Sequence, residues 1–164
     1  HKLMDSDVVV EITGDCPLLD PEIIDMGIET FLINDCDVAF TSESYPGGMD
    51  VLVYKFKILE ENEQTINDPL VREHVAYHIV RHPEIYKTIK LVAPYRWHRP
   101  DYRFTLDYPQ DLEFIREIYR KLEPKYGDNF GIEEIITLVE KSPELLDINF
   151  SCVEMHKKYL EQKK

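Results

Sequence analysis

The chain has 164 residues, 43% of them hydrophobic, which is enough to bury a sizeable core, and we predict a single domain over residues 1–164. A net charge of -13 argues against general binding to nucleic acid or to anionic lipid. There is no apolar run of membrane-spanning length, no secretory signal pattern and no C-x-x-C spacing among the three cysteines, so we expect a cytoplasmic protein without a membrane partner.

The first predicted element is a strand that ends in a carboxylate-bearing turn. Residues 8–12 form a nearly continuous apolar run, which is typical of a strand buried on both faces inside a parallel sheet. Gly14, Asp15, Cys16 and Pro17 then predict a tight turn. Because ligands of open α/β sheets bind beyond the carboxyl ends of the strands, Asp15 lies where a functional carboxylate is expected.

Further strands and helices alternate along the rest of the chain. Asp20 and Pro21 are helix-start signals and predict a helix that ends near Asn34. The later patterns predict strands at residues 37–41, 50–54, 86–92 and 102–106, and helices at 55–63, 67–81, 109–121 and 132–141 and from about 151 onward. This alternation indicates an α/β fold with a largely parallel or mixed sheet.

A second strand-turn-helix unit repeats the pattern of the first. Asp107, Pro109 and Asp111 follow the predicted strand at 102–106. In a parallel sheet Asp15 and Asp107 would meet at one edge, and such a pair suits Mg²⁺, whose remaining ligands are waters and substrate phosphates. The ion would act as a Lewis acid in phosphoryl or nucleotidyl transfer. An aspartate before a helix is also a common cap, so the residues alone leave both roles open.

The histidines of the predicted helix at 67–81 offer a different metal site. His74, His78 and His82 recur at intervals of four residues. Two histidines at this spacing can ligate zinc, but the segment lacks the acidic residue of the H-E-x-x-H motif. We therefore favour surface or half-buried histidines over a zinc site and keep only His74 as a candidate substrate contact.

Five motifs occur in a fixed order over about residues 5–150. They are ITGDCPLLDPEIID, GGMDVLVYKFKIL, REHVAYHIVRHPEIYK, YRFTLDYPQDLEFIREIY and SPELLDIN. Together they resemble the sugar cytidylyltransferases, most closely the spore-coat polysaccharide biosynthesis type. That type is related to acylneuraminate and deoxy-octulosonate cytidylyltransferases.

The resemblance implies a three-layer α/β/α nucleotide-diphospho-sugar transferase fold. It further implies an Mg²⁺-dependent enzyme that transfers CMP from CTP to a sugar acid or related sugar for cell-surface polysaccharide biosynthesis, releasing pyrophosphate. By this resemblance, two aspartates hold the catalytic Mg²⁺ and four further residues face the sugar. In this sequence the metal aspartates are Asp15 and Asp107, and the sugar-facing residues are Asp50, Arg72, Glu73 and His74.

The chain departs from the family at its beginning. The family opens with a strand and a Gly-rich loop bearing Arg and Lys, which cradles the CTP triphosphate. This sequence has no such pattern. We therefore expect a carboxyl-terminal portion whose sheet lacks its amino-terminal strands and which is inactive alone. Unpaired sheet edges favour self-association, so we also expect a homodimer.

Two alternatives remain beside the cytidylyltransferase. The chain could be a non-catalytic dimerisation or partner module, since it lacks the triphosphate loop. It could also be a sugar-nucleotide-dependent glycosyltransferase, because that group shares a similar fold with acidic residues at strand ends.

Overall fold

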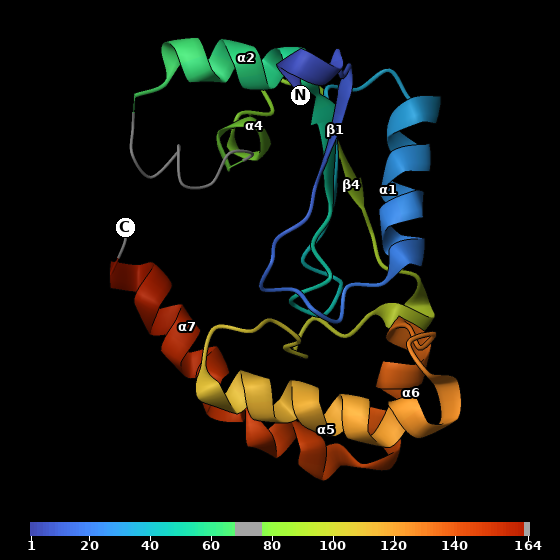
Figure 1. Cartoon of the computed structure of the whole chain (residues 1–164). Helices are drawn as coiled ribbons and strands as arrows, with labels where there is room; N and C mark the ends of the chain where they lie inside the picture. Colours follow the sequence, from blue (N-terminus) through green and yellow to red (C-terminus); the bar gives the residue numbers. More distant parts are fainter. Residues whose placement is uncertain (68–76, 163–164) are drawn as a thin grey trace. The chain divides into compact units, whose positions relative to one another are not determined.

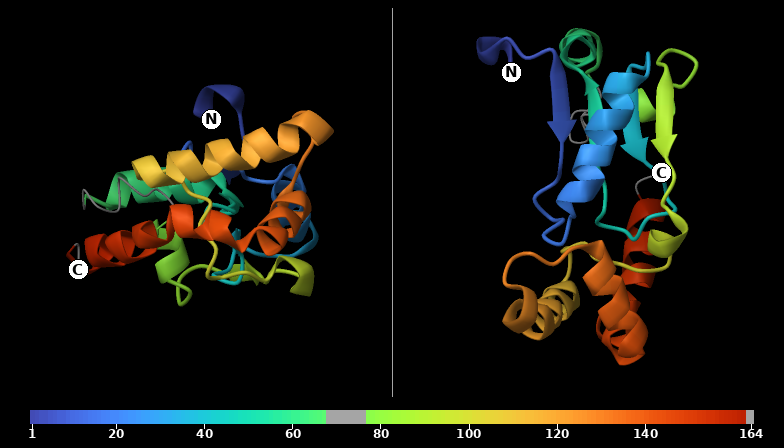
Figure 2. Two further views of the ribbon diagram at one scale, coloured as in Figure 1. Left: turned by 90° about the horizontal axis from the view of Figure 1, so that it is seen from below. Right: turned by 90° about the vertical axis from the view of Figure 1, so that its right-hand side faces the viewer.

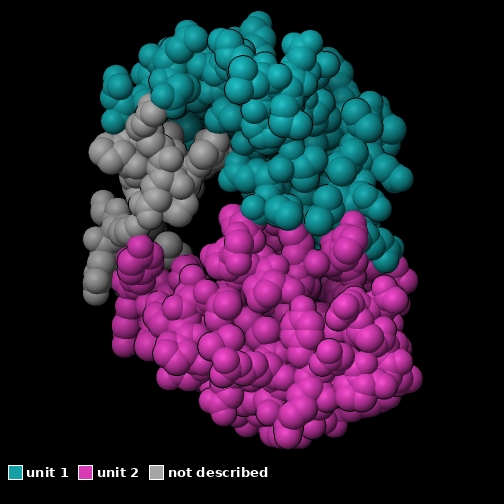
Figure 3. Space-filling view, in the orientation of Figure 1, with its two compact units in different colours: residues 1–12, 22–42, 51–92 teal, residues 13–21, 43–50, 93–164 magenta. Residues whose placement is uncertain are grey.

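The computed structural model describes residues 1–67 and 77–162, and the chain forms two compact units from interleaved segments. Unit 1 comprises residues 1–12, 22–42 and 51–92, and unit 2 comprises residues 13–21, 43–50 and 93–164 (Figure 3). A division by compactness does not say whether the two units unfold together. One domain over residues 1–164 therefore stays a prediction.

Unit 1 is built on a four-stranded mixed sheet (Figure 1). Its strands are β1 (Val8–Glu11), β2 (Val38–Thr41), β3 (Leu52–Lys55) and β4 (Thr88–Leu91), in the order β1-β3-β2-β4. The strand β3 pairs antiparallel with both β1 and β2, whereas β2 and β4 are parallel. Each strand coincides with a predicted one to within a few residues, and the expectation of a mixed sheet is confirmed.

The place of β1 in the sheet differs from the prediction. Among the described strands β1 is terminal and antiparallel to its neighbour, and Val10 is 38% exposed although Val9 is buried. The prediction of a strand is therefore confirmed, but its interior position in a parallel sheet is wrong. Consecutive valines favour extended backbone wherever the strand lies, so they do not report which strands flank it.

Helices cover both faces of this sheet. Helix α1 (Pro21–Ile33) packs through Gly27 against Val51 and Val53, and it runs along the strands in the right-hand view of Figure 2. Helices α2 (Phe56–Thr65) and α4 (Tyr77–Arg81) cover the other face. Their apolar side chains form one cluster with the sheet: Val9, Val38, Phe40, Tyr54, Ile58 and Ile79. The layers of unit 1 are helix, sheet and helix, which confirms the α/β/α prediction.

Unit 2 is mainly helical. Its helices are η2 (Tyr95–Trp97), α5 (Pro109–Tyr126), α6 (Ile132–Lys141), η3 (Pro143–Ile148) and α7 (Phe150–Gln162). The short 3-10 helix η1 (Lys2–Met4) belongs to unit 1, with α1, α2 and α4. Its core holds the fully buried Trp97 and the stacked rings of Phe104 and Phe114, whose centroids are 5.7 Å apart. Within residues 1–67 and 77–162, no helix is long and apolar enough to cross a membrane.

The structure lacks one predicted strand and describes only the end of one predicted helix. The strand predicted at 102–106 is wrong, because the segment makes only an isolated bridge between Arg103 and Gly47. Arg103 and Phe104 are consecutive and both buried, which breaks the alternation that a strand with one solvated face requires. The helix predicted at 67–81 is present as α4 at its end, and residues 68–76 lie outside the described residues.

Candidate functional site

Three segments of unit 2 are joined through one extended stretch, residues 102–106. Gly47 N donates to Tyr102 O at 2.9 Å, and Phe104 N donates back to Gly47 O at 2.7 Å. Leu106 N donates to Asp15 O at 2.8 Å. The turn after β1, the turn before Asp50 and the residue before Asp107 are therefore tied to the same backbone.

The turn that carries Asp50 depends on Gly48. Its φ is 95°, and a Cβ there would lie 2.8 Å from both the Phe104 carbonyl carbon and the Thr105 nitrogen. Only glycine combines this conformation with so close an approach. The Gly48 N–H also donates to Asp50 Oδ2 at 3.2 Å, so the turn itself orients that carboxylate.

The charge of Asp15 acts on the carboxylate of Asp50. Burial of the Asp50 carboxylate among neighbouring atoms raises its pKa, the Gly48 N–H opposes this, and the negative charge of Asp15 raises the pKa further. Both side chains remain accessible to solvent. Two like charges at a crowded but accessible place favour a bound cation or proton, which is a common property of functional sites.

Asp107 is accessible as well, and its two oxygens differ. Arg103 Nη2 donates to Asp107 Oδ2 at 2.5 Å, and His156 Nδ1 lies 4.0 Å from the same oxygen. Within the described part of the chain, no donor to Asp107 Oδ1 is found. Arg103 thus holds the carboxylate at Oδ2, and Oδ1 has no protein donor among the described residues.

Asp111 holds this arrangement in place. Its side chain is fully buried and accepts hydrogen bonds from Arg103 Nε at 3.0 Å and Nη2 at 2.9 Å. The backbone N–H groups of Asp107 and Tyr108 donate to Asp111 Oδ2 at 3.1 Å each. Burial alone would raise the pKa of Asp111, but these donors outweigh it and keep the pKa below its usual value. Asp111 is therefore a structural anion that shapes the Asp107 turn.

Sequence reasoning missed three residues of this cluster. Arg103 lies four residues before Asp107 and eight before Asp111. An arginine this close to two aspartates could have predicted an ion pair with them. Asn149 is 2% exposed and donates from Nδ2 to Arg103 O and to Asp111 Oδ1, both at 3.0 Å. Asn149 is the last residue of the SPELLDIN motif, but no role follows for it from that motif, and no local pattern marks His156, because the partners of both residues are distant in the sequence.

Cys16, beside Asp15, is a packed side chain. Burial raises the pKa of its thiol to about 11, although a hydrogen bond with the Thr13 hydroxyl opposes the shift. A thiol with so high a pKa is protonated at neutral pH and is a poor nucleophile.

Comparisons with known proteins identify the family of this chain. The sequence profile described as "Cytidylyltransferase" matches residues 1–140. The chain belongs to the cytidylyltransferase family. This membership confirms the resemblance carried by the five motifs.

Individual relatives of this family are similar over most of the chain. Spore coat polysaccharide biosynthesis protein SpsF of Bacillus subtilis is 28% identical over 137 residues, which is 84% of this chain and 56% of that protein. Uncharacterized protein MJ1063 of Methanocaldococcus jannaschii is 31% identical over 148 residues, 90% of this chain and 59% of that protein. The chain therefore spans less than two thirds of the length of these relatives.

A solved structure shares the fold. It is a cytidylyltransferase from Leptospira borgpetersenii, with a TM-score of 0.81 and 24% sequence identity over 88% of this chain and 60% of that one. At 24% identity this similarity supports a shared fold and nothing more. The α/β cytidylyltransferase fold of this chain is thereby confirmed.

The oxygen donors at these two turns fit Mg²⁺ chemically. Asp15 and Asp107 offer hard, accessible oxygens on two joined turns, and Mg²⁺ needs only one or two carboxylates when waters and phosphates complete its octahedron. Among the described residues, no group of three or more His, Cys, Asp or Glu is placed to hold a metal by itself. A site of this kind would depend on the substrate phosphates for the rest of its ligands.

The remaining predicted site residues are outside the described residues. Arg72, Glu73 and His74 fall within 68–76. Of the histidines considered for zinc, His78 and His82 have ring centroids 4.3 Å apart, and His82 Nδ1 is 2.6 Å from Glu84 Oε1. The partner of His82 is thus a carboxylate at the surface, in line with the preference for ordinary histidines.

Proposed function

We propose that the chain is the metal-binding and sugar-binding portion of an enzyme that transfers CMP from CTP to a sugar acid or related sugar for cell-surface polysaccharide biosynthesis. The observation that carries the proposal is the hydrogen bond from Leu106 N to Asp15 O, since it joins the two turns whose aspartates match the metal residues of the family. The name of the SpsF relative supports the biosynthetic role.

Asp15 and Asp107 would hold Mg²⁺, which supplies charge neutralisation at the CTP phosphates. The sugar hydroxyl oxygen forms a bond to the α-phosphorus, the bond between that phosphorus and the α–β bridging oxygen breaks, and pyrophosphate leaves with the bonding electrons. The hydroxyl proton passes to solvent. Arg103 fixes Asp107 Oδ2, so that Oδ1 faces the ligand without rearrangement during the reaction.

The sugar would lie beside Asp50. This carboxylate is accessible, is oriented by the Gly48 N–H and is suited to accept hydrogen bonds from sugar hydroxyls. Arg72, Glu73 and His74 are the other proposed sugar contacts, on the strength of the family resemblance. A cationic residue among them would select a sugar that carries a carboxylate.

A partner module without its own activity is the second candidate. It is a candidate because residues 1–164 contain no Gly-rich loop with Arg and Lys of the kind that cradles the CTP triphosphate in this family. Under either reading we propose that the chain is inactive alone and forms a homodimer, and that it acts in the cytoplasm.

Pyrophosphate release tests the proposal. The amino-terminal segment of SpsF is fused in front of the chain, and release is measured with CTP, Mg²⁺ and a panel of sugar acids. We expect release from the fusion and none from the chain alone. Asp15→Ala and Asp107→Ala abolish it in folded protein, whereas Glu113→Ala, an exposed change on α5, preserves it.

The controls separate the two candidates. Full activity of both aspartate variants would contradict the metal assignment. A fusion that folds and self-associates but releases no pyrophosphate with any sugar would favour the partner module.

A further inference from the structure

Helix α7 lies beyond the residues that the family profile matches. The profile covers residues 1–140, and α7 runs from Phe150 to Gln162 (Figure 1). Nothing in the family motifs therefore assigns a role to its side chains. Its position within unit 2 nevertheless brings it to the Asp107 turn.

Asn149 anchors the start of α7 at this turn. Its side chain is 2% exposed, and Nδ2 donates both to the backbone oxygen of Arg103 and to Asp111 Oδ1, at 3.0 Å each. These bonds link the helix to the same two residues that hold Asp107. The first turn of α7 is thus fixed relative to the candidate metal ligand.

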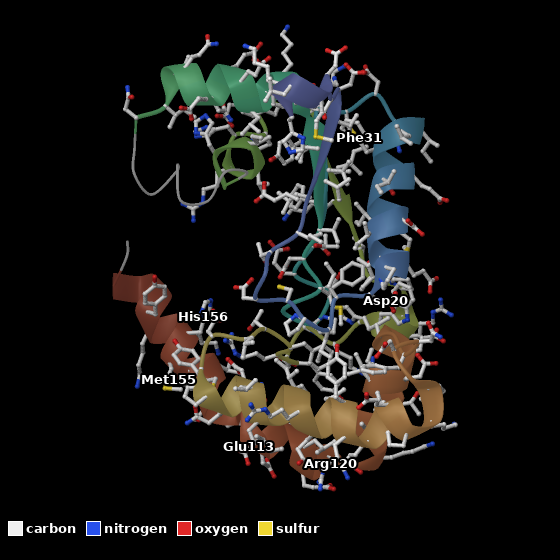
Figure 4. The ribbon with its side chains drawn as sticks, in the orientation of Figure 1. Asp20, Phe31, Glu113, Arg120, Met155 and His156 are labelled. Atoms are coloured by element: carbon white, nitrogen blue, oxygen red, sulfur yellow. The ribbon has the colours of Figure 1, made fainter. Side chains whose placement is uncertain are left out.

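His156 lies two turns further along and reaches Asp107. Its Nδ1 is 4.0 Å from Asp107 Oδ2, and its side chain is 38% exposed (His156 is labelled in Figure 4). Arg103 Nη2 donates to the same oxygen. The imidazole therefore sits at the accessible rim of the site, close to the carboxylate but not buried beneath it.

We infer that His156 is a phosphate contact of this site, supplied by a helix outside the family-matched residues. The inference rests on the proposed function, because a triphosphate on an ion held by Asp107 would lie within reach of a group 4.0 Å from that carboxylate. A phosphate oxygen requires an N–H donor, and imidazole supplies one in both its neutral and its charged form. A role that only fixes α7 would predict an effect of His156 on folding and none on CTP.

Titration of the fusion that carries the amino-terminal segment of SpsF with CTP, in the presence of Mg²⁺, distinguishes these roles. We expect His156→Ala to weaken CTP binding about tenfold in calorimetry, as for the loss of one hydrogen bond to a charged group, with little change in melting temperature. His156→Gln, which keeps an N–H donor, should restore much of the affinity. The matched control is Lys157→Ala, which removes an exposed cation from the neighbouring position of α7.

A second measurement uses the fusion without any substitution, so its result does not depend on whether a variant folds. The imidazole NMR signals of His156 should shift on addition of CTP and Mg²⁺, whereas those of His82, in unit 1, should not. Wild-type affinity in His156→Ala, or an unmoved His156 signal in a fusion that binds CTP, would overturn the inference alone. A folded fusion that binds no CTP at all would overturn the inference together with the proposed function.

Discussion

At the level of single residues, the buried carboxylate of Asp111 organises the turn that presents Asp107. It pairs with Arg103 through two hydrogen bonds and also accepts from Asn149. Replacing it with alanine leaves a buried guanidinium without its main partner, and losing one partner of a buried pair costs about 3–5 kcal/mol. We expect Asp111→Ala to lower the free energy of unfolding by this amount, measured by urea denaturation.

A neighbouring carboxylate serves as the control for this change. Glu113 is on the same helix, α5, but is exposed (Figure 4). Surface substitutions of this kind alter stability by less than about 0.5 kcal/mol. Equal effects of Glu113→Ala and Asp111→Ala would contradict the structural role given to Asp111.

The same residue predicts a dependence of stability on pH. Burial works against ionisation of Asp111, but the Arg103, backbone and Asn149 donors hold its pKa below the ordinary value of 3.8. A carboxylate whose pKa is lowered by folding stabilises the protein above its unfolded-state pKa, and this contribution is lost as the pH falls through the folded-state value. The stability difference between wild type and Asp111→Asn should therefore be constant near neutral pH and shrink below 3.8.

Urea denaturation of both proteins across the acidic range measures this difference. The asparagine side chain has no proton that titrates in this range. The other acidic groups contribute equally to the free energy of unfolding of both proteins, so their contributions cancel in the difference. A difference that persists unchanged well below 3.8 would show that folding does not lower the pKa of Asp111.

How far the candidate site could be predicted depends on how local its signals are. Asp15 and Asp107 stand out because a turn and a helix start follow each of them within a few residues. The role of Asn149 does not follow from the SPELLDIN motif that it ends, because Asn149 contacts Asp111 across 38 residues of sequence. Contacts of this range depend on the packing of α5 against η3, which the residues of one segment do not report.

At the level of whole elements, the start of α6 is capped by a carboxylate from another part of the chain. Asp20 Oδ2 accepts a hydrogen bond from Ile132 N at 2.7 Å (Asp20 is labelled in Figure 4). The residue before the helix is Gly131, and a Cβ there would lie 2.2 Å from Asp20 Oδ2. The glycine is therefore required for the carboxylate to reach the helix.

This geometry predicts a coupled pair of substitutions. Asp20→Ala removes the cap, which costs about 1 kcal/mol, and Gly131→Ala displaces the same carboxylate at a similar cost. Because both changes break one contact, the double variant should lose less stability than the sum of the single variants. Urea denaturation of the four proteins measures the coupling.

A second glycine gives the control. Nothing lies within 4 Å of a Cβ placed on Gly14, so Gly14→Ala should not couple to Asp20→Ala. Strict additivity of Asp20→Ala and Gly131→Ala would mean that the cap does not stabilise α6.

The elements themselves were predictable to different degrees. Helices α1, α5 and α6 follow from apolar residues at helical spacing and from start signals, both of which are local. The neighbours of β1 and the absence of a strand at 102–106 are not local properties, since pairing depends on residues such as Lys55 and Gly47 far along the chain. Asp20 illustrates the same limit: a helix-start signal for α1 in sequence, it also binds the first turn of α6.

At the scale of the whole molecule, the two compact units are built from interleaved segments. The chain passes from one to the other after residues 12, 21, 42, 50 and 92, so neither unit is a contiguous piece. If unit 2 unfolded alone, the strands and helices of unit 1 would have to close several disordered loops at once, and each closure costs entropy. We therefore expect one cooperative unfolding transition, as predicted for a single domain.

Two probes can follow the units separately in urea. The single tryptophan, Trp97, is buried in unit 2, so its fluorescence reports that unit, whereas hydrogen exchange of the β3 amides reports unit 1. In a cooperative molecule Asp111→Ala, which lies in unit 2, should lower the protection of β3 by the same free energy that it removes from the Trp97 transition. Unchanged exchange of β3 in this variant would establish two independent folding units and refute the single domain.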